Sequence, residues 1–293
     1  MSPHGPTASM SRLAPVTVGL VAVSWMTGCQ PEIAPSDAEP VYAAEDDASD
    51  PTGLAEGQTA DADLELTPAQ ITVVTAGDPA APPDLRREAL LRIVNSSAGG
   101  DPVYLAFYRA ILIETDTDPT VAAVAAMGLG DFGEPSDTGF LTPLLTHEDA
   151  FLRWRAAVAL QRLHNTQAIA PLLEAATDDE DADVRATAAY ALGQYRRRDV
   201  VDGLITALDD RDYGVSRAAR ETLQLLTGHD AGDDPRAWVA FVNDHSATLF
   251  DHAAAYTYEP YPERNPFNLL QFFGSPDPEP ALPTGYTPPV PAP

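Results

Sequence analysis

The sequence predicts an all-α fold, an α-α superhelix of about five helical hairpins between residues 83 and 245. Two observations support it. A local pattern recurs five times at spacings of 31 to 36 residues, and the apolar positions inside each copy have helical spacing. A third observation sets the limits: acidic and Pro-rich segments flank this region, and we expect them to be disordered.

The recurring pattern places an alanine at the centre of one helical face. Its first positions are apolar: Leu85, Val121, Leu152, Val184 and Val215. Four residues on stands an alanine in every copy: Ala89, Ala125, Ala156, Ala188 and Ala219. Eight residues on stands an aliphatic residue: Ile93, Leu129, Leu160, Leu192 and Leu223. Offsets of 0, 4 and 8 lie on one face of an α-helix, and alanine in the middle lets a neighbouring helix approach closely.

A second apolar segment follows most copies, so each unit is predicted to be helix, turn, helix. These segments are Val103 to Ile113, Phe140 to Leu145, Ala168 to Ala176 and Val200 to Leu208. Asp118-Pro119 and the acidic stretch Asp178 to Asp183 are typical of helix starts, where carboxylates accept hydrogen bonds from unpaired amides. Gly130 and Gly193 stand where a C-cap glycine is expected.

These residues resemble HEAT repeats, specifically the short variety of phycobilisome-lyase-like proteins. Asp183-Val184-Arg185, Ala188-Ala189 and Ala191-Leu192-Gly193 carry the resemblance, with Leu152-Arg153, Ala156-Ala157 and Ala159-Leu160 as the matching residues. The resemblance covers residues 83–245 and implies a HEAT-like solenoid. It also implies that Arg86, Arg153 and Arg185 bond loop carboxylates of the adjacent repeat, whereas Ala122 and Ser216 depart from this pattern. Trp238, in Asp234-Pro235-Arg236-Ala237-Trp238, is implied to lie in a terminal helix that closes the stack.

The N-terminus is typical of a bacterial lipoprotein signal peptide spanning residues 1–28. An apolar run from Leu13 to Trp25 follows Arg12 and is too short to span a bilayer. It leads into Met26-Thr27-Gly28-Cys29, which resembles the lipobox, although Met26 stands where leucine is usual. We therefore expect Cys29 to be lipidated and the protein to be secreted across the inner membrane and anchored to the outer membrane. The alternatives are an ordinary signal peptide or a buried apolar segment.

Two further segments complete the domain organisation. Residues 29–82 form an expected acidic disordered tether, since residues 30–84 carry 13 acidic side chains and no arginine. Only Leu64 to Val74 is apolar enough for a short helix or a cap on the next segment. Residues 246–293 form an aromatic and Pro-rich C-terminal tail. We expect residues 250–273 to pack as a strap along the folded region and the rest to be free.

Composition excludes several classes of function. All 17 basic residues are arginine, so Schiff-base chemistry and a P-loop lysine are excluded. One cysteine cannot form a disulfide or a multi-cysteine zinc site. A net charge of -27 opposes binding to nucleic acid. A single His147-Glu148 pair does not supply a di-iron site, and Asp179, Asp181 and Asp183 lack the glycine and glutamate of an EF-hand. We expect no metal, no cofactor and no catalytic residue.

Two candidate binding features remain. Trp154 lies outside the 0, 4, 8 face and is either an exposed anchor or an interior contact with the preceding unit. Arg196, Arg197 and Arg198 form a basic cluster that either receives an anion or pairs with nearby acids such as Asp209, Asp210 and Asp212; we favour pairing. The sequence thus predicts a non-enzymatic module that binds an unidentified protein partner as a scaffold at the bacterial envelope. The alternative is an enzyme related to bilin lyases or HEAT-type hydroxylases.

Overall fold

The computed structural model describes residues 67–114, 117–258 and 280–289, all within one compact unit. Among these residues the regular secondary structure is entirely helical, apart from two isolated β-bridges. The predicted all-α fold is therefore confirmed. The predictions for the signal peptide, Cys29 and most of the tether lie outside the described residues.

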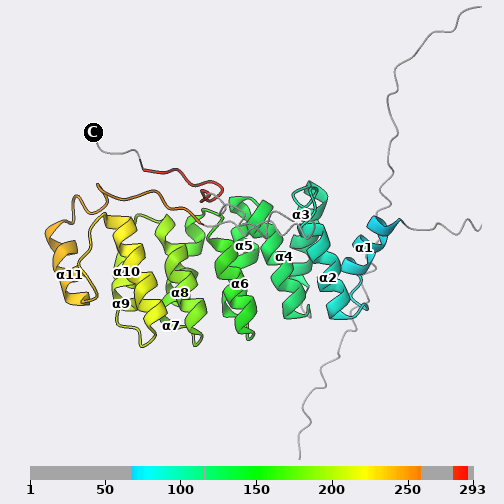
Figure 1. Ribbon diagram of the computed structural model, residues 1–293, viewed down its shortest axis with the longest axis horizontal. Helices are drawn as coiled ribbons and strands as arrows, with labels where there is room; N and C mark the ends of the chain where they lie inside the picture. Colours follow the sequence, from blue (N-terminus) through cyan, green and yellow to red (C-terminus); the bar gives the residue numbers. More distant parts are fainter. Residues whose placement is uncertain (1–66, 115–116, 259–279, 290–293) are drawn as a thin grey trace, which may run out of the picture. The chain divides into compact units, whose positions relative to one another are not determined.

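Helical hairpins form at the predicted positions. The first helices of the five units are α2 (Pro83–Val94), α4 (Pro119–Phe132), α6 (Ala150–Leu160), α8 (Ala182–Ala191) and α10 (Tyr213–Thr227). The second helices are α3 (Pro102–Ile113), α5 (Thr138–Leu141) with the 3-10 helix η2 (Thr142–Thr146), α7 (Ile169–Asp178), α9 (Arg198–Ala207) and α11 (Pro235–Asp244). Short helices α1 (Pro68–Gly77), η1 (Pro135–Asp137), η3 (Thr166–Ala168) and η4 (Leu192–Gln194) complete the described elements. The first helices stand side by side in chain order (Figure 1).

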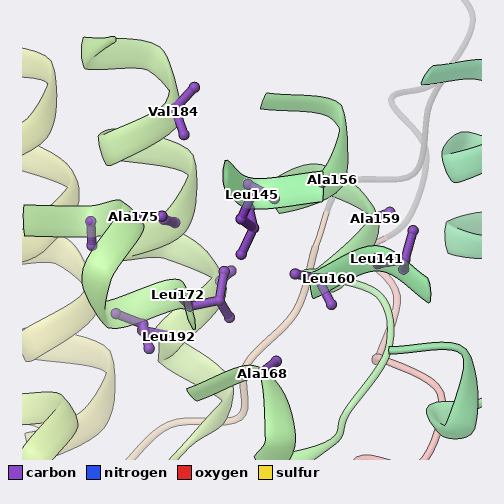
Figure 2. Close-up of a cluster of buried hydrophobic side chains, with 14 of the residues drawn as sticks. Leu141, Leu145, Ala156, Ala159, Leu160, Ala168, Leu172, Ala175, Val184 and Leu192 are labelled. Atoms are coloured by element: carbon purple, nitrogen blue, oxygen red, sulfur yellow. The ribbon is translucent and has the colours of Figure 1, made fainter. Parts of the chain in front are cut away.

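The repeated apolar positions form the core between neighbouring hairpins. The alanines at offset 4 are buried in all five units, and four of them have no exposed surface. Figure 2 shows the core of the central units, where Leu145, Leu160, Leu172 and Leu192 lie in one cluster with Ala156 and Ala175. Small residues on the first helices thus allow close helix approach, while leucines from both layers fill the remaining space.

Leu85 departs from the predicted burial. The first residue of each later unit is buried, whereas Leu85 is 52% exposed. Leu152, for example, packs against Ala122 and Ala123 of the preceding unit. No full hairpin precedes α2 in the described residues, so this side of α2 lacks a neighbouring first helix to cover it. Only α1 lies there, in the segment for which a short helix or cap was predicted.

Aspartates cap the first helices as predicted. The carboxylate of Asp118 accepts the backbone amide of Thr120 at the start of α4. Asp181 likewise accepts the amides of Asp183 and Val184 at the start of α8. The acidic stretch from Asp178 to Asp183 therefore includes a helix cap, in which a carboxylate satisfies amides that have no partner within the helix.

Gly130 and Gly193 are not C-caps, which corrects the sequence prediction. Gly130 lies inside α4, and a Cβ there would stand 2.9 Å from the Cα of Ala159 on α6. Gly193 lies inside η4, and a Cβ would stand 2.8 Å from the Cδ2 of Tyr256. Both positions require glycine because another chain segment approaches closely, rather than because the backbone turns.

The C-terminal part of the chain returns across the hairpins as a strap, which we define as residues 249–258 and 280–287. Leu249 and Tyr256 are buried, as expected for the first of these stretches. The expectation that the tail is free beyond residue 273 is wrong for residues 280–287. The amide of Thr284 donates to the carbonyl of Arg162 at 2.7 Å, and the amide of His164 donates to the carbonyl of Thr284 at 2.9 Å. These two bonds give main-chain polar groups of the loop 161–165 partners in the strap. Residues 259–279 and 290–293 lie outside the described part of the chain.

Candidate functional site

Buried arginines connect successive hairpins, as the resemblance implied. Nε and Nη2 of Arg153 donate to the two carboxylate oxygens of Asp179, at 2.8 and 2.9 Å. Arg185 binds Asp210 with the same two-bond geometry, at 2.7 and 3.0 Å. Arg86 bonds Glu114 at 3.1 Å. We call these three pairs the arginine ladder. In each pair, an arginine on a first helix binds a carboxylate in the loop that precedes the first helix of the next unit.

Backbone carbonyls complete each position of the ladder. Nη1 of Arg185 donates to the carbonyls of Asp179 and Glu180, at 2.7 and 3.1 Å. Asp179 therefore accepts from Arg153 through its side chain and from Arg185 through its backbone. The hydrogen bond with Asp210 raises the pKa of Arg185. Burial is the largest effect and favours a raised pKa for Asp210, but the hydrogen bonds from Arg185 and from the amide of Asp212, together with the nearby arginine charges, hold the pKa below its ordinary value.

The second unit lacks both halves of this pair. Ala122 stands at the arginine position, and His147 stands in the loop where Asp179 and Asp210 stand in later units. Nδ1 of His147 accepts the amide of Asp149 at 3.0 Å, as Oδ1 of Asp179 accepts the amide of Asp181 at 2.8 Å. His147 is therefore a turn residue, in agreement with the sequence interpretation. The joint loss of arginine and carboxylate avoids leaving a buried charge unpaired.

An aromatic and arginine cluster lies on α6. The rings of Phe151 and Trp154 are 5.8 Å apart, and the guanidinium of Arg155 lies 4.8 Å from the Trp154 ring and 5.3 Å from the Phe151 ring. Phe151 is 46% exposed. Trp154 is half-buried and packs against the core. Trp154 thus combines both predicted environments, with an interior contact and a part that reaches the surface.

Side chains on the equivalent helical face of α8 and α10 extend this surface. The hydroxyl of Tyr190 donates to Glu221 at 2.7 Å, and Arg217 bonds the other oxygen of Glu221 at 2.7 Å. Burial, aided by the bond to Glu221, raises the pKa of Tyr190 to about 12. Counted from the first position of each unit, these residues stand at offsets -1, 2, 3 and 6, which are three or four residues apart and therefore share one helical face. We call this set the first-helix face: Phe151, Trp154, Arg155, Tyr190, Arg217 and Glu221.

The basic cluster pairs locally, as favoured, but with other acids than those named from the sequence. Arg197 bonds Asp199 at 2.7 Å, and Arg198 bonds Asp202 at 2.9 Å. Asp210 is engaged by Arg185 instead. Nη2 of Arg196 reaches the carbonyl of Thr287 in the strap at 3.4 Å. Binding of an anion by this cluster stays a prediction.

Trp238 lies in the terminal helix as the resemblance implied. It has no exposed surface, and its Nε1 donates to the carbonyl of Gly232 at 2.7 Å. Its ring meets that of Phe241 edge to face, with centroids 6.2 Å apart. Asp234 caps α11 through the amide of Arg236. A buried indole with a satisfied N–H anchors this end of the described hairpins.

Neither a metal cluster nor a membrane span occurs in the described part of the chain. Across residues 67–114, 117–258 and 280–289, no group of three or more His, Cys, Asp or Glu side chains is placed to hold an ion. The helices in these ranges are too short or too polar to cross a bilayer.

Comparison with known proteins agrees with the hairpin architecture. The family model described as HEAT repeats matches residues 107–193 and 169–237, so the chain contains a HEAT-repeat domain. No curated protein matches the chain. Among solved structures, the designed armadillo repeat protein YIII(Dq)4CqI has 14% identity and a TM-score of 0.42, covering 62% of this chain and 89% of that one. Human deoxyhypusine hydroxylase in complex with glycerol has 18% identity and a TM-score of 0.28, covering 61% and 89%.

Proposed function

We propose that this chain is a non-enzymatic protein-interaction scaffold whose first-helix face binds a protein partner. The observation that carries the proposal is the aromatic and arginine cluster of α6, in which Phe151 is exposed and Trp154 and Arg155 are partly buried. Repeat solenoids hold each hairpin between its neighbours and so present a long, ordered surface. Aromatic residues and arginine are the side chains that most often dominate the binding energy of protein interfaces.

The charges of the face indicate the chemistry of the partner. Arg155 lies over two aromatic rings, and Arg217 is paired with Glu221. The face therefore carries cations in a chain with a net charge of -27. A partner of mixed charge would complement this distribution.

A crosslinking comparison tests the face. The full mature chain with Cys29→Ser is crosslinked to envelope extract, and the captured proteins are quantified by mass spectrometry. Phe151→Ala and Arg155→Ala should each reduce capture of the specific partner at least about tenfold, which corresponds to roughly 1.4 kcal/mol. Tyr213→Ala, which removes a 78% exposed aromatic ring outside the face, is the matched control and should change nothing. Equal capture by all variants would contradict the proposal.

We also propose that Cys29 carries a lipid anchor that holds the scaffold at the envelope. The support is the lone cysteine directly after a signal-like apolar run. Cys29→Ser should move the protein from the membrane fraction to the supernatant. Unchanged membrane association in this variant would overturn the anchor.

Elemental and absorption analysis of the purified protein distinguishes a scaffold from an enzyme. We expect no stoichiometric metal and no bound chromophore. One equivalent of iron or a covalent bilin would contradict the scaffold and support an enzyme.

A further inference from the structure

The second stretch of the strap is seated in a groove by both backbone and side-chain contacts. The groove is the surface of the repeats that this stretch contacts, with His164, Thr166 and residues 194–197 in its wall, and residues 285–287 of the strap line the same hollow. Thr284 pairs with Arg162 and His164 through both of its main-chain polar groups. Pro283 is buried, and the hydroxyl of Tyr286 accepts the amide of Tyr256 at 3.1 Å. This is the arrangement by which proteins capture extended peptides, with main-chain bonds for affinity and pockets for selectivity.

The walls of the groove are held in place without the strap. Nε2 of Gln194, which is 2% exposed, donates to the carbonyls of Leu160 and Ala191. Tyr195 donates its hydroxyl to the carbonyl of Asn165 at 3.0 Å and stacks on His164 with centroids 5.0 Å apart. All of these contacts belong to the repeats. The groove is therefore preorganised, which lowers the entropic cost of binding a peptide.

The occupant meets a strict steric condition at Gly285. Its φ of +83° is a conformation that favours glycine, and a Cβ would stand 2.7 Å from the Cγ of Pro135 in η1. Tyr286 follows at once and places its ring edge on His164, with centroids 5.4 Å apart. The groove thus selects the motif Pro-x-Gly-Tyr and does not accept every extended segment.

We propose that this groove is a peptide-binding site for an extended, uncharged segment of the form Pro-x-Gly-Tyr, occupied in cis by residues 283–286 of this chain. A partner protein that carries such a segment binds by replacing the strap. The site is distinct from the first-helix face, so the failure of one proposal would not contradict the other.

Because residues 283–286 belong to the same chain as the groove, they have an advantage over a free peptide that binds at the same place. Tyr258 and Ala281 are joined by two backbone hydrogen bonds of 2.9 Å, so the two described stretches of the strap lie next to each other. Because the cis segment belongs to the same chain as the groove, its binding is intramolecular, with an effective concentration on the order of millimolar. A free peptide at micromolar concentration should therefore fail against the wild-type chain and succeed once the cis segment is weakened.

Thr284→Pro weakens the occupant and leaves every residue of the groove wall unchanged. Proline has no N–H, so the 2.7 Å bond to Arg162 is lost. The probe is a fluorescein-labelled peptide of residues 279–290, titrated with the full mature chain and followed by anisotropy. We expect the variant to bind this peptide at least about tenfold more tightly than the wild type does. A peptide with Gly285→Val should not bind, whereas one with Thr287→Ala should bind as the parent peptide does.

Two outcomes would overturn the proposal. The first is no binding to the variant at millimolar peptide while its circular dichroism matches that of the wild type. The second is equal binding to both proteins, because the peptide would then occupy some other surface. If Thr284→Pro does not fold, Gly285→Val in the full chain empties the groove by a steric clash instead, and the same titration decides.

Discussion

Arg185 illustrates how single residues hold this solenoid together. Its guanidinium donates to both carboxylate oxygens of Asp210 and to the carbonyls of Asp179 and Glu180. Its side chain is 5% exposed. A lysine could not make these directed bonds, because an ammonium lacks the planar fork of the guanidinium. The absence of lysine from the whole sequence is consistent with charges that are used in this directional way.

Truncation of Arg185 should be strongly destabilising. Arg185→Ala removes the guanidinium from the largely buried carboxylate of Asp210, which keeps only the amide of Asp212, and from two carbonyls, at a cost of about 3–5 kcal/mol. Arg92→Ala is the matched control, since Arg92 forms an exposed pair with Glu88 that contributes about 0.3–0.5 kcal/mol. Urea unfolding followed by circular dichroism measures both. Similar midpoints for the two variants would show that the ladder adds little.

The Arg185–Asp210 pair should also produce acid sensitivity. The pKa of Asp210 is lower in the folded chain than its ordinary value. Its contribution to stability is therefore complete above the unfolded pKa of about 3.9 and is lost as pH falls through the lower folded value. Asp210→Asn should flatten the dependence of stability on pH below about pH 4. Asp84→Asn, which removes an exposed carboxylate, should leave the slope as in the wild type.

At the scale of elements, the first helices were predictable and the contacts of the strap were not. The spacing of alanine and leucine placed α4, α6, α8 and α10 because one buried face repeats in every unit. The second helix of unit two was harder, since its segment forms only the short α5 and η2. Contacts between distant segments leave no periodic trace, so the seating of Thr284 on the loop 161–165 was missed.

Contacts that the local sequence does not reveal also explain why the two glycines and part of the candidate site were misinterpreted or missed. Gly130 and Gly193 were interpreted from local sequence as helix ends, whereas their neighbours in space make glycine necessary. Trp154 was recognised as lying outside the repeated face, but its partners Phe151 and Arg155 on the same turn were not. Trp154 and Arg155 stand three and four residues after Phe151, and this spacing on a helix is a signal that would have found them.

Alanine substitutions at these glycines should have different consequences. Gly130→Ala brings a Cβ against the backbone of Ala159, so α4 and α6 must separate, at an overpacking cost of about 1–3 kcal/mol. Gly193→Ala meets only the ring of Tyr256 and a methyl of Thr222, so it should displace the strap and leave the hairpins folded. Urea unfolding should detect the first change. Hydrogen exchange at the amide of Ala254, which bonds Leu225, should detect the second.

A double variant with Tyr256→Ala provides the control for Gly193→Ala. Tyr256→Ala removes the ring that the new Cβ would strike, so the double variant should lose less than the sum of the two single changes. Strict additivity would indicate that Gly193 is required for some reason other than the close approach of Tyr256.

At the scale of the whole molecule, the contacts are of two kinds: local contacts between neighbouring hairpins and long-range contacts made by the strap. Each hairpin packs on its neighbours, so stability is built from local terms and openings are expected to stay near their origin. The strap instead bonds residues far apart in the chain, from Leu225 in α10 to Arg162 beyond α6. It also spans the end of the hairpins in Figure 1 that lies opposite the acidic loops. The strap should therefore couple hairpins that would otherwise open separately.

Trp238→Ala tests how far such an opening spreads. Loss of this fully buried side chain should cost about 3–5 kcal/mol and free the carbonyl of Gly232. We expect hydrogen exchange to rise in α9, α10 and α11 and to stay at wild-type levels in α4, because α4 shares no interface with the terminal helix. Val239→Ala, at a 46% exposed position of α11, is the matched control and should leave all protection unchanged. Adding Gly285→Val to Trp238→Ala detaches the strap, and because the strap bonds both α10 and the loop after α6, we expect a further loss of protection in α6 and α8. Protection equal to that of Trp238→Ala alone would contradict the coupling by the strap.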